Sequence, residues 1–542
     1  MNNNKFSYQV NGQEINLPID SDHIALKFYE PSPRSARCKF VTENKLLGEF
    51  STRLEIPGEK FTIFKLTNEP KTSPQMANTA VAFLNQSEEI KKVIPVFKSG
   101  NKRVLAIDKI IIGFQPDNFN SAPILKKYNC EKIEESYNEM LVRIPESADI
   151  FDLMRLIEME NEVAYVEPDF ITIGSNNNRK ISYSSPDSGH KIDDKKDLSK
   201  LQYALKLTMA EEAWKIQLGN KNIKIAILDE GVETSHPDLK SIIEKSFDAT
   251  DDDTFQEPNS WDGHGTACCG LAAAEHKKFG IKGLSGGCAV FAVRLAYSNA
   301  PESEWITSNS IIRRAIDWSW NSGADVLSNS WGGGAPSNAI TNAFNRAREK
   351  GRNGKGCVVV IAAGNEDAKV SYPGNLKDVL TVSASNEYDE PKTKFSQDGE
   401  YWWGSCFGAE VDIAAPGVHN LTTDMSGNKG YNKEHNYTDF NGTSSSTPIV
   451  AGIAALMLSA NSSLSEKEVR DIIKRTADKV GHVPYVQGHN HRMGFGRVNA
   501  LNAVNAAIGV NSNYGQAEKS ASFVKPTKEK ANHLISSSMN IF

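Results

Sequence analysis

Three short segments contain the residue types of a nucleophilic triad, in the chain order Asp, His and Ser. Asp229 closes the apolar run 225–228, His264 stands between two glycines, and Ser444 lies in the segment 441–448, ahead of an apolar helical stretch. A serine hydroxyl becomes a useful nucleophile near neutral pH only when a base lies within hydrogen-bond reach and a third group orients that base. The three segments therefore supply the groups needed to attack a carbonyl carbon.

A fourth residue fits the same chemistry. Asn365 follows a predicted buried strand at 358–362 and offers a side-chain amide as a hydrogen-bond donor. The helix expected after Ser444 points its partial positive charge toward the place where an oxyanion would develop. Each residue alone is more often a turn, loop or cap residue, but the occurrence of all the roles together favours catalysis.

On these motifs the chain resembles the subtilisin family of serine proteases. The serine motif, Gly-Thr-Ser with a proline four residues after the serine, is matched within 442–448, and the histidine motif at 264–266. The aspartate motif is matched at 229–231, with Glu230 inside it. The resemblance covers about residues 199–510 and implies that family's fold, a doubly wound α/β domain with a parallel sheet.

The resemblance also implies a role for each residue. Ser444 would attack the peptide carbonyl, His264 would carry the proton, and Asp229 would hold the imidazole. The Asn365 amide and the Ser444 backbone N–H would bind the oxyanion. The substrate-binding residues that it implies are Ser330, Trp331, Gly332, Ala362, Ala363, Gly364 and Glu230.

Some segments are closer to the kexin-like branch of the family, which cuts after paired basic residues by means of acidic pockets. These segments are 328–332, 351–356 and 494–497. The acids that follow Ser-Trp-Gly in that branch are replaced here by 333–337, whereas Glu230 matches an acidic position that serves the residue second from the cut. We hypothesise a preference for a basic residue at that substrate position.

A calcium site is a further implication of the resemblance. Asp238 matches a calcium ligand of the family, and carboxylate oxygens suit Ca²⁺. The loop 275–280, which would complete the site, departs from the family pattern with Lys277 and Lys278. The triad chemistry requires no cofactor. A structural Ca²⁺ at Asp238 is therefore not needed for the reaction, and it stays an open alternative.

Composition and charge are those of a globular protein. The 542 residues are 39% hydrophobic and 24% charged, with a net charge of −6, which allows two or three domains and a large core. No basic stripe is present, so nucleic acid is not an expected partner. Residues 1–20 lack a signal-peptide core and no run reaches membrane-spanning length, so we expect a cytoplasmic protein without membrane contact, although secretion without an N-terminal signal stays open.

The seven cysteines are scattered, which suits reduced thiols in a reducing compartment. Cys268 and Cys269 fall on a predicted helix and are expected to pack in the core. A regulatory thiol close to His264 is the alternative interpretation.

The chain is expected to divide into five parts. Residues 1–101 and 102–174 look like two loose copies of one small α+β (ferredoxin-like) unit, in which strands and helices alternate. The polar segment 175–198 is predicted to be a flexible linker, residues 199–510 the catalytic domain, and the tail 511–542 disordered.

The second copy resembles the family's prodomain, which assists folding and then blocks the cleft with its C-terminal end. The linker would then be the activation segment, and the basic pairs at 179–180 and 195–196 are candidate cutting sites. The partners expected are therefore a protein or peptide substrate and the chain's own N-terminal region. The first copy is interpreted as a second inhibitory lobe or a docking module.

The sequence thus predicts a serine endopeptidase made as an inactive precursor, with a processing or regulatory role. One alternative is a peptide-binding scaffold that keeps the fold without catalysis. A lipase or esterase would need Gly-x-Ser-x-Gly around the nucleophile, which 442–446 does not provide.

Overall fold

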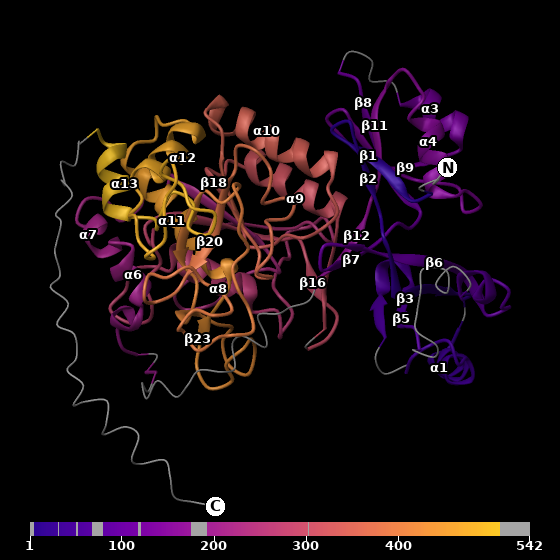
Figure 1. Cartoon of the computed structure of the whole chain (residues 1–542), viewed down its shortest axis with the longest axis horizontal. Coiled ribbons are helices and arrows are strands. Elements are labelled where there is room, and N and C mark those ends of the chain that lie inside the picture. Colours follow the sequence, from indigo (N-terminus) through magenta and orange to yellow (C-terminus); the bar gives the residue numbers. More distant parts are fainter. Residues whose placement is uncertain are drawn as a thin grey trace, which may run out of the picture.

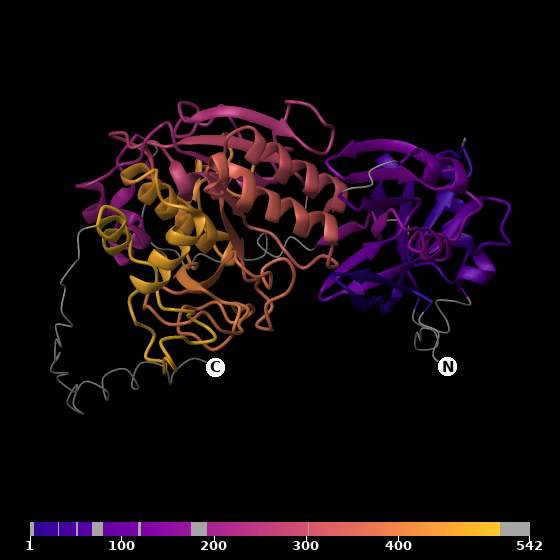
Figure 2. The same ribbon diagram turned by 90° about the horizontal axis from the view of Figure 1, so that it is seen from above.

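The structure is a computed structural model, and it describes most of the chain between residues 5 and 509. Two lobes lie side by side, with the N-terminal residues up to 174 in one and the remainder in the other (Figures 1 and 2). The residues not described within this span are 31, 50–52, 68–79, 117–120, 175–191, 194 and 302.

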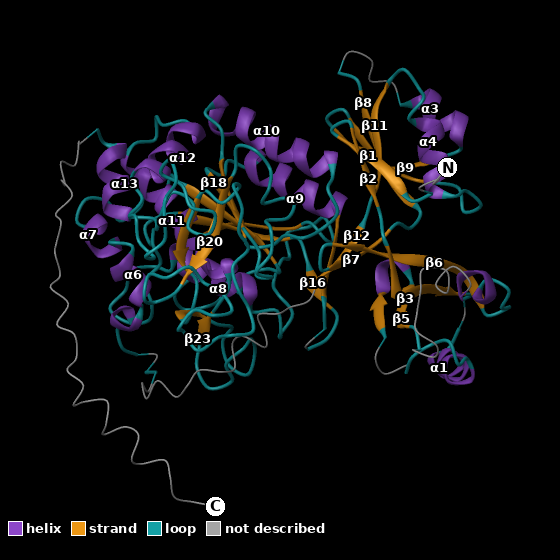
Figure 3. Ribbon diagram, viewed as in Figure 1, coloured by secondary structure: helices purple, strands orange, loops and turns teal. Residues whose placement is uncertain are grey.

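The larger lobe is built on a seven-stranded sheet (Figure 3) in the order β14-β15-β13-β18-β19-β20-β21, and every neighbouring pair is parallel. Strands buried on both faces are expected to be apolar runs, which is how the sequence predicted this α/β fold. The fold class is confirmed. The bounds are Lys224–Asp229 (β13), Ile243–Asp248 (β14), Ala289–Arg294 (β15), Val326–Asn329 (β18), Val358–Ala362 (β19), Leu380–Ser385 (β20) and Ile413–Pro416 (β21).

Helices cover both faces of this sheet. One face packs on α8, α11 and α13, and the other on α9 and α10. Helix α11 is long and apolar enough to cross a membrane, but 89% of it is buried within the protein, as in a core helix. The bounds are His264–Ala273 (α8), Asn309–Asn321 (α9), Asn338–Gly354 (α10), Thr443–Ala460 (α11), Glu466–Arg475 (α12) and Ala500–Ala507 (α13).

The N-terminal lobe contains two units of the same topology. Their sheet orders are β6-β3-β5-β4 and β11-β8-β10-β9, so each places its fourth strand beside the first, then the third, then the second. All of these pairs are antiparallel, and the second unit follows the β-α-β-β-α-β pattern of ferredoxin-like motifs. The two units therefore share one strand order, and the duplication of sequence stays a prediction. The bounds are Ile19–Phe28 (β3), Arg34–Glu43 (α1), Leu54–Ile56 (β4), Phe61–Lys65 (β5), Ile90–Ser99 (β6), Lys109–Phe114 (β8), Ala122–Tyr128 (α3), Glu131–Ser136 (β9), Glu139–Arg143 (β10), Ile150–Ile157 (α4) and Val163–Pro168 (β11).

Three further strands tie these parts together. Strand β7 (Lys102–Leu105) forms a hairpin with β6, so the division expected at residue 101 falls inside a hairpin. Strand β12 (Ile171–Gly174) follows the second unit but pairs with β7 of the first. The small hairpin β1–β2, between residues 7 and 16, packs against the core of the second unit.

Parts of the expected organisation fall on residues that the structure does not describe. These include most of the linker, the basic pair at 179–180 and the whole tail. Within the first unit, residues 80–84 are described and have a helical backbone. The linker and the tail therefore stay predictions.

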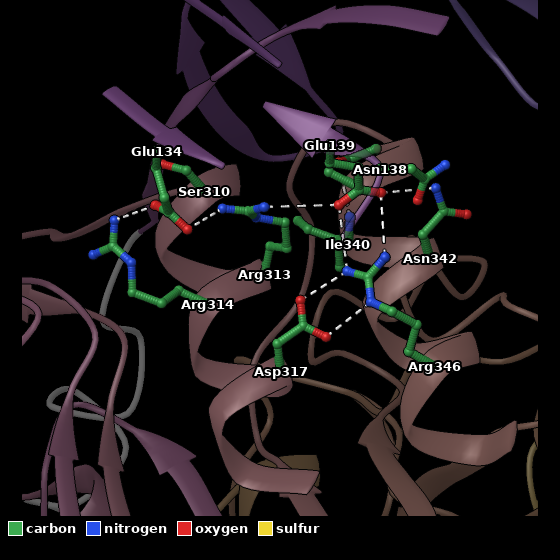
Figure 4. A network of polar contacts seen from close by, with 12 residues as sticks. Glu134, Asn138, Glu139, Ser310, Arg313, Arg314, Asp317, Ile340, Asn342 and Arg346 are labelled. Carbon is green, nitrogen blue, oxygen red and sulfur yellow. Dashed lines mark hydrogen bonds and ion pairs between the residues drawn. The ribbon is translucent and has the colours of Figure 1, made fainter. Parts of the chain in front are cut away.

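A buried charge network joins the second unit to the larger lobe (Figure 4). Glu139 on β10 accepts hydrogen bonds from both terminal nitrogens of Arg346 on α10, each at 3.3 Å. The same guanidinium donates to Asp317 on α9 at 2.7 and 2.9 Å. The Glu139 side chain is fully buried, and Arg346 is the cation shared by both carboxylates, while Arg313 lies 3.8 Å from Glu139 as a second cation.

A neighbouring pair of arginines extends the network. On α9, Arg313 and Arg314 both donate to Glu134 of β9, with 2.7 Å for the Arg314 contact. Arg313 is 1% exposed. Arginines on α9 and α10 therefore bind carboxylates on the sheet of the second unit. The planar guanidinium groups favour one defined orientation of that sheet on the two helices.

Two further carboxylates of the second unit cap these helices. Glu167 accepts from the backbone N–H of Asn338 at 2.6 Å, at the start of α10, and Asp169 accepts from the N–H and hydroxyl of Ser310, at the start of α9. Helix N-termini carry unsatisfied N–H groups and partial positive charge, which acidic side chains satisfy. Burial raises the pKa of Glu167 to about 7, so it takes up a proton more readily than an exposed glutamate.

We predict that Arg346→Leu destabilises the full chain strongly. The substitution removes the cation of the buried Asp317 and leaves Glu139 only its 3.8 Å contact with Arg313. Breaking a buried pair in this way typically costs about 3–5 kcal/mol. A thermal unfolding scan should show a lower midpoint for the part of the transition that includes the lobe interface. Lys467→Leu breaks only an exposed pair with Asp471, so it should leave the midpoint almost unchanged, and equal effects of the two variants would contradict the prediction.

Candidate active site

The candidate site lies where the parallel strands end. Strand β13 ends at Asp229, α8 begins at His264, α11 begins one residue before Ser444, and Asn365 follows β19. The carboxyl ends of parallel strands meet at one edge of the sheet, which is where ligands bind in such folds. Four segments that are far apart in sequence are thereby brought to one place.

Asp229 and His264 are directly hydrogen bonded. The Nδ1–H of His264 donates to Asp229 Oδ1 at 2.7 Å, and both side chains are buried. The approach depends on Gly265, because a Cβ there would lie 2.2 Å from the carbonyl oxygen of Gly231. The bond at Nδ1 holds the ring so that Nε2 is the nitrogen available as a base.

Ser444 lies in the first turn of α11, whereas the sequence placed it ahead of the helix. Pro448, inside α11, has no N–H to bond the carbonyl four residues earlier, which is that of Ser444. That carbonyl instead accepts from the Ser330 hydroxyl at 3.0 Å and contacts the Cys268 thiol at 3.5 Å. The Ser444 hydroxyl donates to the carbonyl of Ser330 at 3.1 Å. A change of its side-chain rotamer is therefore needed to direct it to His264.

Asn365 is oriented by the residue before the serine. Its Oδ1 accepts from the N–H of Thr443 at 2.8 Å and from the Thr443 hydroxyl at 3.0 Å. With the oxygen so engaged, the NH₂ end of the amide is the end left for a ligand in the adjoining cavity, which both residues line.

One cavity is lined by every site residue named from the sequence except Asp238. It therefore collects the triad candidates, Asn365 and the expected substrate-binding residues in a single cleft. Sequence reasoning missed several lining residues, because no local motif marks them. These are Lys102, Leu295, Ala296, Trp305, Thr307, Gly333, Glu366, Ser371 and Thr443.

The charge at Asp229 sets the protonation of the histidine. Burial alone would lower the pKa of His264, but the charge and hydrogen bond of Asp229, assisted by Glu230, raise it above its usual value. Burial also raises the pKa of the Cys268 thiol well above its usual range, and the Asp229 charge adds to this. Cys268 is therefore a protonated thiol packed under the site, as expected for a core residue.

An extended segment of the N-terminal lobe pairs with a strand that lines this cleft. Strand β12 pairs antiparallel with β17 (Trp305–Ser308), and two residues of β17 line the cavity. In this pair, Ile171 lies opposite Ser308 at one end and Gly174 lies opposite Trp305 at the other. Strand addition of this kind is how an extended peptide binds a free sheet edge.

Asp238 lies apart from the cavity, and its two carboxylate oxygens differ in their contacts. Its Oδ2 accepts from the Tyr437 hydroxyl at 2.9 Å and from the N–H of Ile281 at 3.1 Å. The Lys277 ammonium donates to the carbonyl of Pro237, beside Asp238. The other carboxylate oxygen of Asp238, Oδ1, is buried and accepts no hydrogen bond from the described residues, so it is left for a cation. The calcium site at Asp238 therefore stays a prediction.

The sequence is similar to a large group of known proteins. A family model described as the subtilase family matches residues 220–496, just over half of the chain. The calcium-dependent protease of Nostoc sp. is 28% identical over 92% of this chain and 79% of its own length. Thermitase of Thermoactinomyces vulgaris is 33% identical over 56% of this chain and 96% of its own length.

The fold is also shared with a solved structure. Fervidolysin from Fervidobacterium pennivorans, described as a keratinolytic enzyme related to subtilisin, superposes with a TM-score of 0.58 and 21% identity. The match covers 73% of this chain and 61% of that one. At this identity the similarity concerns the fold alone.

The geometry predicts an unusually basic histidine. We expect the His264 ring, assigned by its absence in a His264→Gln variant, to titrate in NMR spectra above its ordinary pKa of 6.5. Asp229→Asn should bring the pKa below 6.5, because burial then acts without the compensating charge. Asp252→Asn, a change on an exposed loop, is the control. A His264 pKa that is the same in wild type and Asp229→Asn would overturn the assignment.

Proposed function

Because the chain belongs to the subtilase family and is a serine endopeptidase, we propose that Asp229, His264 and Ser444 are its catalytic triad. The observation that carries the proposal is the 2.7 Å bond between His264 and Asp229, in the same cleft as Ser444 and Asn365. The raised pKa of His264 favours proton acceptance at the moment when the serine attacks.

In the proposed reaction, the Ser444 hydroxyl first leaves the carbonyl of Ser330 and turns toward Nε2 of His264. The imidazole accepts the hydroxyl proton while the oxygen bonds to the peptide carbonyl carbon, and Asp229 stabilises the imidazolium that forms. His264 then gives the proton to the departing amine, leaving an acyl group on Ser444. Water, deprotonated by the same imidazole, releases the acyl group and restores the enzyme.

Developing negative charge on the carbonyl oxygen is stabilised by two donors. The NH₂ group of Asn365 is available because Thr443 occupies the oxygen of that amide. The second donor is the backbone N–H of Ser444, in the first turn of α11, where N–H groups lack helical partners. Both donors are fixed before substrate binds, so little reorganisation is needed during the reaction.

The walls of the cleft determine how substrate is held. Segment 330–332 and residues 362–364 line it and offer backbone groups to an extended peptide, which favours recognition of shape. Glu230 adds a negative charge next to Asp229. We assign to it the preference for a basic residue second from the scissile bond.

The N-terminal lobe is proposed to keep the enzyme as a latent precursor. Strand β12 occupies the edge of β17 that an incoming peptide would use, and Glu167 and Asp169 hold the adjoining segment on α10 and α9. Cutting within residues 175–198 would release this segment. A protease with such built-in restraint fits a processing or regulatory role better than unrestricted digestion.

The proposed chemistry uses no cofactor. The name of the Nostoc relative describes a calcium-dependent protease, and in this chain the buried Oδ1 of Asp238, which accepts no hydrogen bond from the described residues, is the candidate ligand for a structural Ca²⁺. None of the proton transfers above involves that region.

A non-catalytic peptide-binding scaffold is the alternative, and the nucleophile separates the two. We predict that a fluorophosphonate probe labels the linker-cut wild type and that Ser444→Ala abolishes labelling and peptide hydrolysis. Ser445→Ala removes the neighbouring hydroxyl, which bonds Asn420 away from the cleft, and should keep labelling. Mass spectrometry should show new N-termini in the linker only in active chains. Labelling that survives in Ser444→Ala would exclude the proposed nucleophile.

The assignment of Glu230 is tested with a peptide library. In Glu230→Gln, cleavage of peptides with Lys or Arg second from the cut should fall about five- to ten-fold in kcat/KM, as expected for loss of one charge at short range. Peptides with a neutral residue there should be cut as before. Asp252→Asn, in the acidic run outside the cleft, is the matched control. An unchanged preference in Glu230→Gln refutes the idea.

A further inference from the structure

We propose that the first N-terminal unit is a second inhibitory lobe, which clamps strand β12, at the edge of the cleft, with its own strand β7. This inference rests on the proposed function of the cleft. It assigns to the first unit a role separate from that of the second, whose tail β12 pairs with the edge of the cleft.

The two units present corresponding strands to the cleft. In each unit the fourth strand, β6 or β11, is followed at once by a short strand, β7 or β12. These two tail strands pair antiparallel, from Leu105 opposite Ile171 to Arg103 opposite Ile173. Since β12 also pairs with β17, an eight-stranded sheet runs from the larger lobe through β12 into the first unit (Figures 1 and 3).

The core of the first unit covers β12 directly. Ile171 and Ile173 belong to one buried cluster with residues of the first unit and with one residue of β17. These partners are Ile63, Val96, Leu105 of β7 and Ile306 of β17. Freeing β12 from the edge of the cleft therefore exposes these side chains as well as breaking hydrogen bonds on both of its edges. The second unit alone does not supply this second edge.

The β6–β7 turn also reaches the cleft. The Asn101 side-chain amide donates to Glu366 Oε1 at 2.7 Å, across 265 positions of the chain. Lys102 lines the cavity, is 8% exposed, and places its ammonium 5.6 Å from the centre of the Trp305 ring. Lys102, the first residue of β7, therefore lines the cleft itself, and Asn101 bonds a residue that lines it.

A charged contact and a backbone contact fix the turn in place. Arg103 forms an ion pair with Glu304, the residue before β17, and the Ser99 hydroxyl donates to the carbonyl of Gly334 at 3.1 Å. Both contacts join the first unit to the larger lobe without passing through the second unit. The clamp is therefore separable from the second unit by mutation.

The test measures the basal activity of the full chain before its linker is cut, with chain integrity followed by mass spectrometry. Arg103→Glu sets two carboxylates against each other at the β7 edge, and it should raise the initial rate of fluorogenic peptide hydrolysis about ten-fold. Adding Asn101→Ala should raise the rate further. The charge swap, Arg103→Glu with Glu304→Arg, should return the rate toward that of wild type.

Lys39→Glu is the matched control, since it makes the same charge change on α1 of the same unit, at a side chain 75% exposed. Amide exchange at residues 171–174 should be faster in Arg103→Glu and unchanged in Lys39→Glu, which distinguishes release of β12 from general unfolding. Wild-type basal rates and exchange in Arg103→Glu, in chains that become active once the linker is cut, would overturn the clamp. Absence of both activity and fluorophosphonate labelling after cutting would instead overturn the proposed function, and the clamp with it.

Discussion

The hydrogen bond between Asp229 and His264 is the contact around which the larger lobe is organised. A buried carboxylate is costly unless it is paired, so Asp229 requires both the imidazole and the N–H of Glu230 that it accepts. The end of β13 and the start of α8 must then lie within hydrogen-bond reach, which only glycine at position 265 permits. The apolar packing of both sheet faces is compatible with this one arrangement.

The serine is positioned by a related device. A proline within a helix normally costs stability, because it removes one hydrogen bond and leaves a carbonyl unsatisfied. Here the carbonyl released by Pro448 is that of Ser444, and Ser330 satisfies it from the adjoining wall of the cleft. In return, the backbone carbonyl of Ser330 accepts a hydrogen bond from the Ser444 hydroxyl. The nucleophile and the cleft wall are thus held together by a reciprocal pair of hydrogen bonds.

Charged contacts orient the second unit of the N-terminal lobe on helices α9 and α10 of the larger lobe. Helices α9 and α10 present N-termini and arginines, and the second unit presents carboxylates that match both (Figure 4). Buried pairs of this kind contribute orientation more than net stability, because desolvation offsets much of their attraction. Orientation is what a restraining segment needs, since β12 must meet β17 in one register. The first unit adds an apolar cover over the same strand.

The sequence by itself determined the fold class and the candidate catalytic residues, but not all of the residues that line the cleft. Buried parallel strands appear as apolar runs, and the motifs around Asp229, His264 and Ser444 are local, so both could be read without any knowledge of distant contacts. The sequence predicted the start of α11 too late, after Ser444, because a proline inside a helix normally marks its first turn, whereas Pro448 lies in the second. The division at residue 101 was drawn through a hairpin, since the likeness of the two units is stronger in strand order than in sequence. Only the tertiary structure decided that Asn101 meets Glu366, that Arg346 bridges Glu139 and Asp317, and that β7 lies beside β12. The sequence around each of these residues is ordinary for a loop, a strand or a helix surface, so no local pattern marks them. Their interactions gain strength only when folding removes both partners from water together.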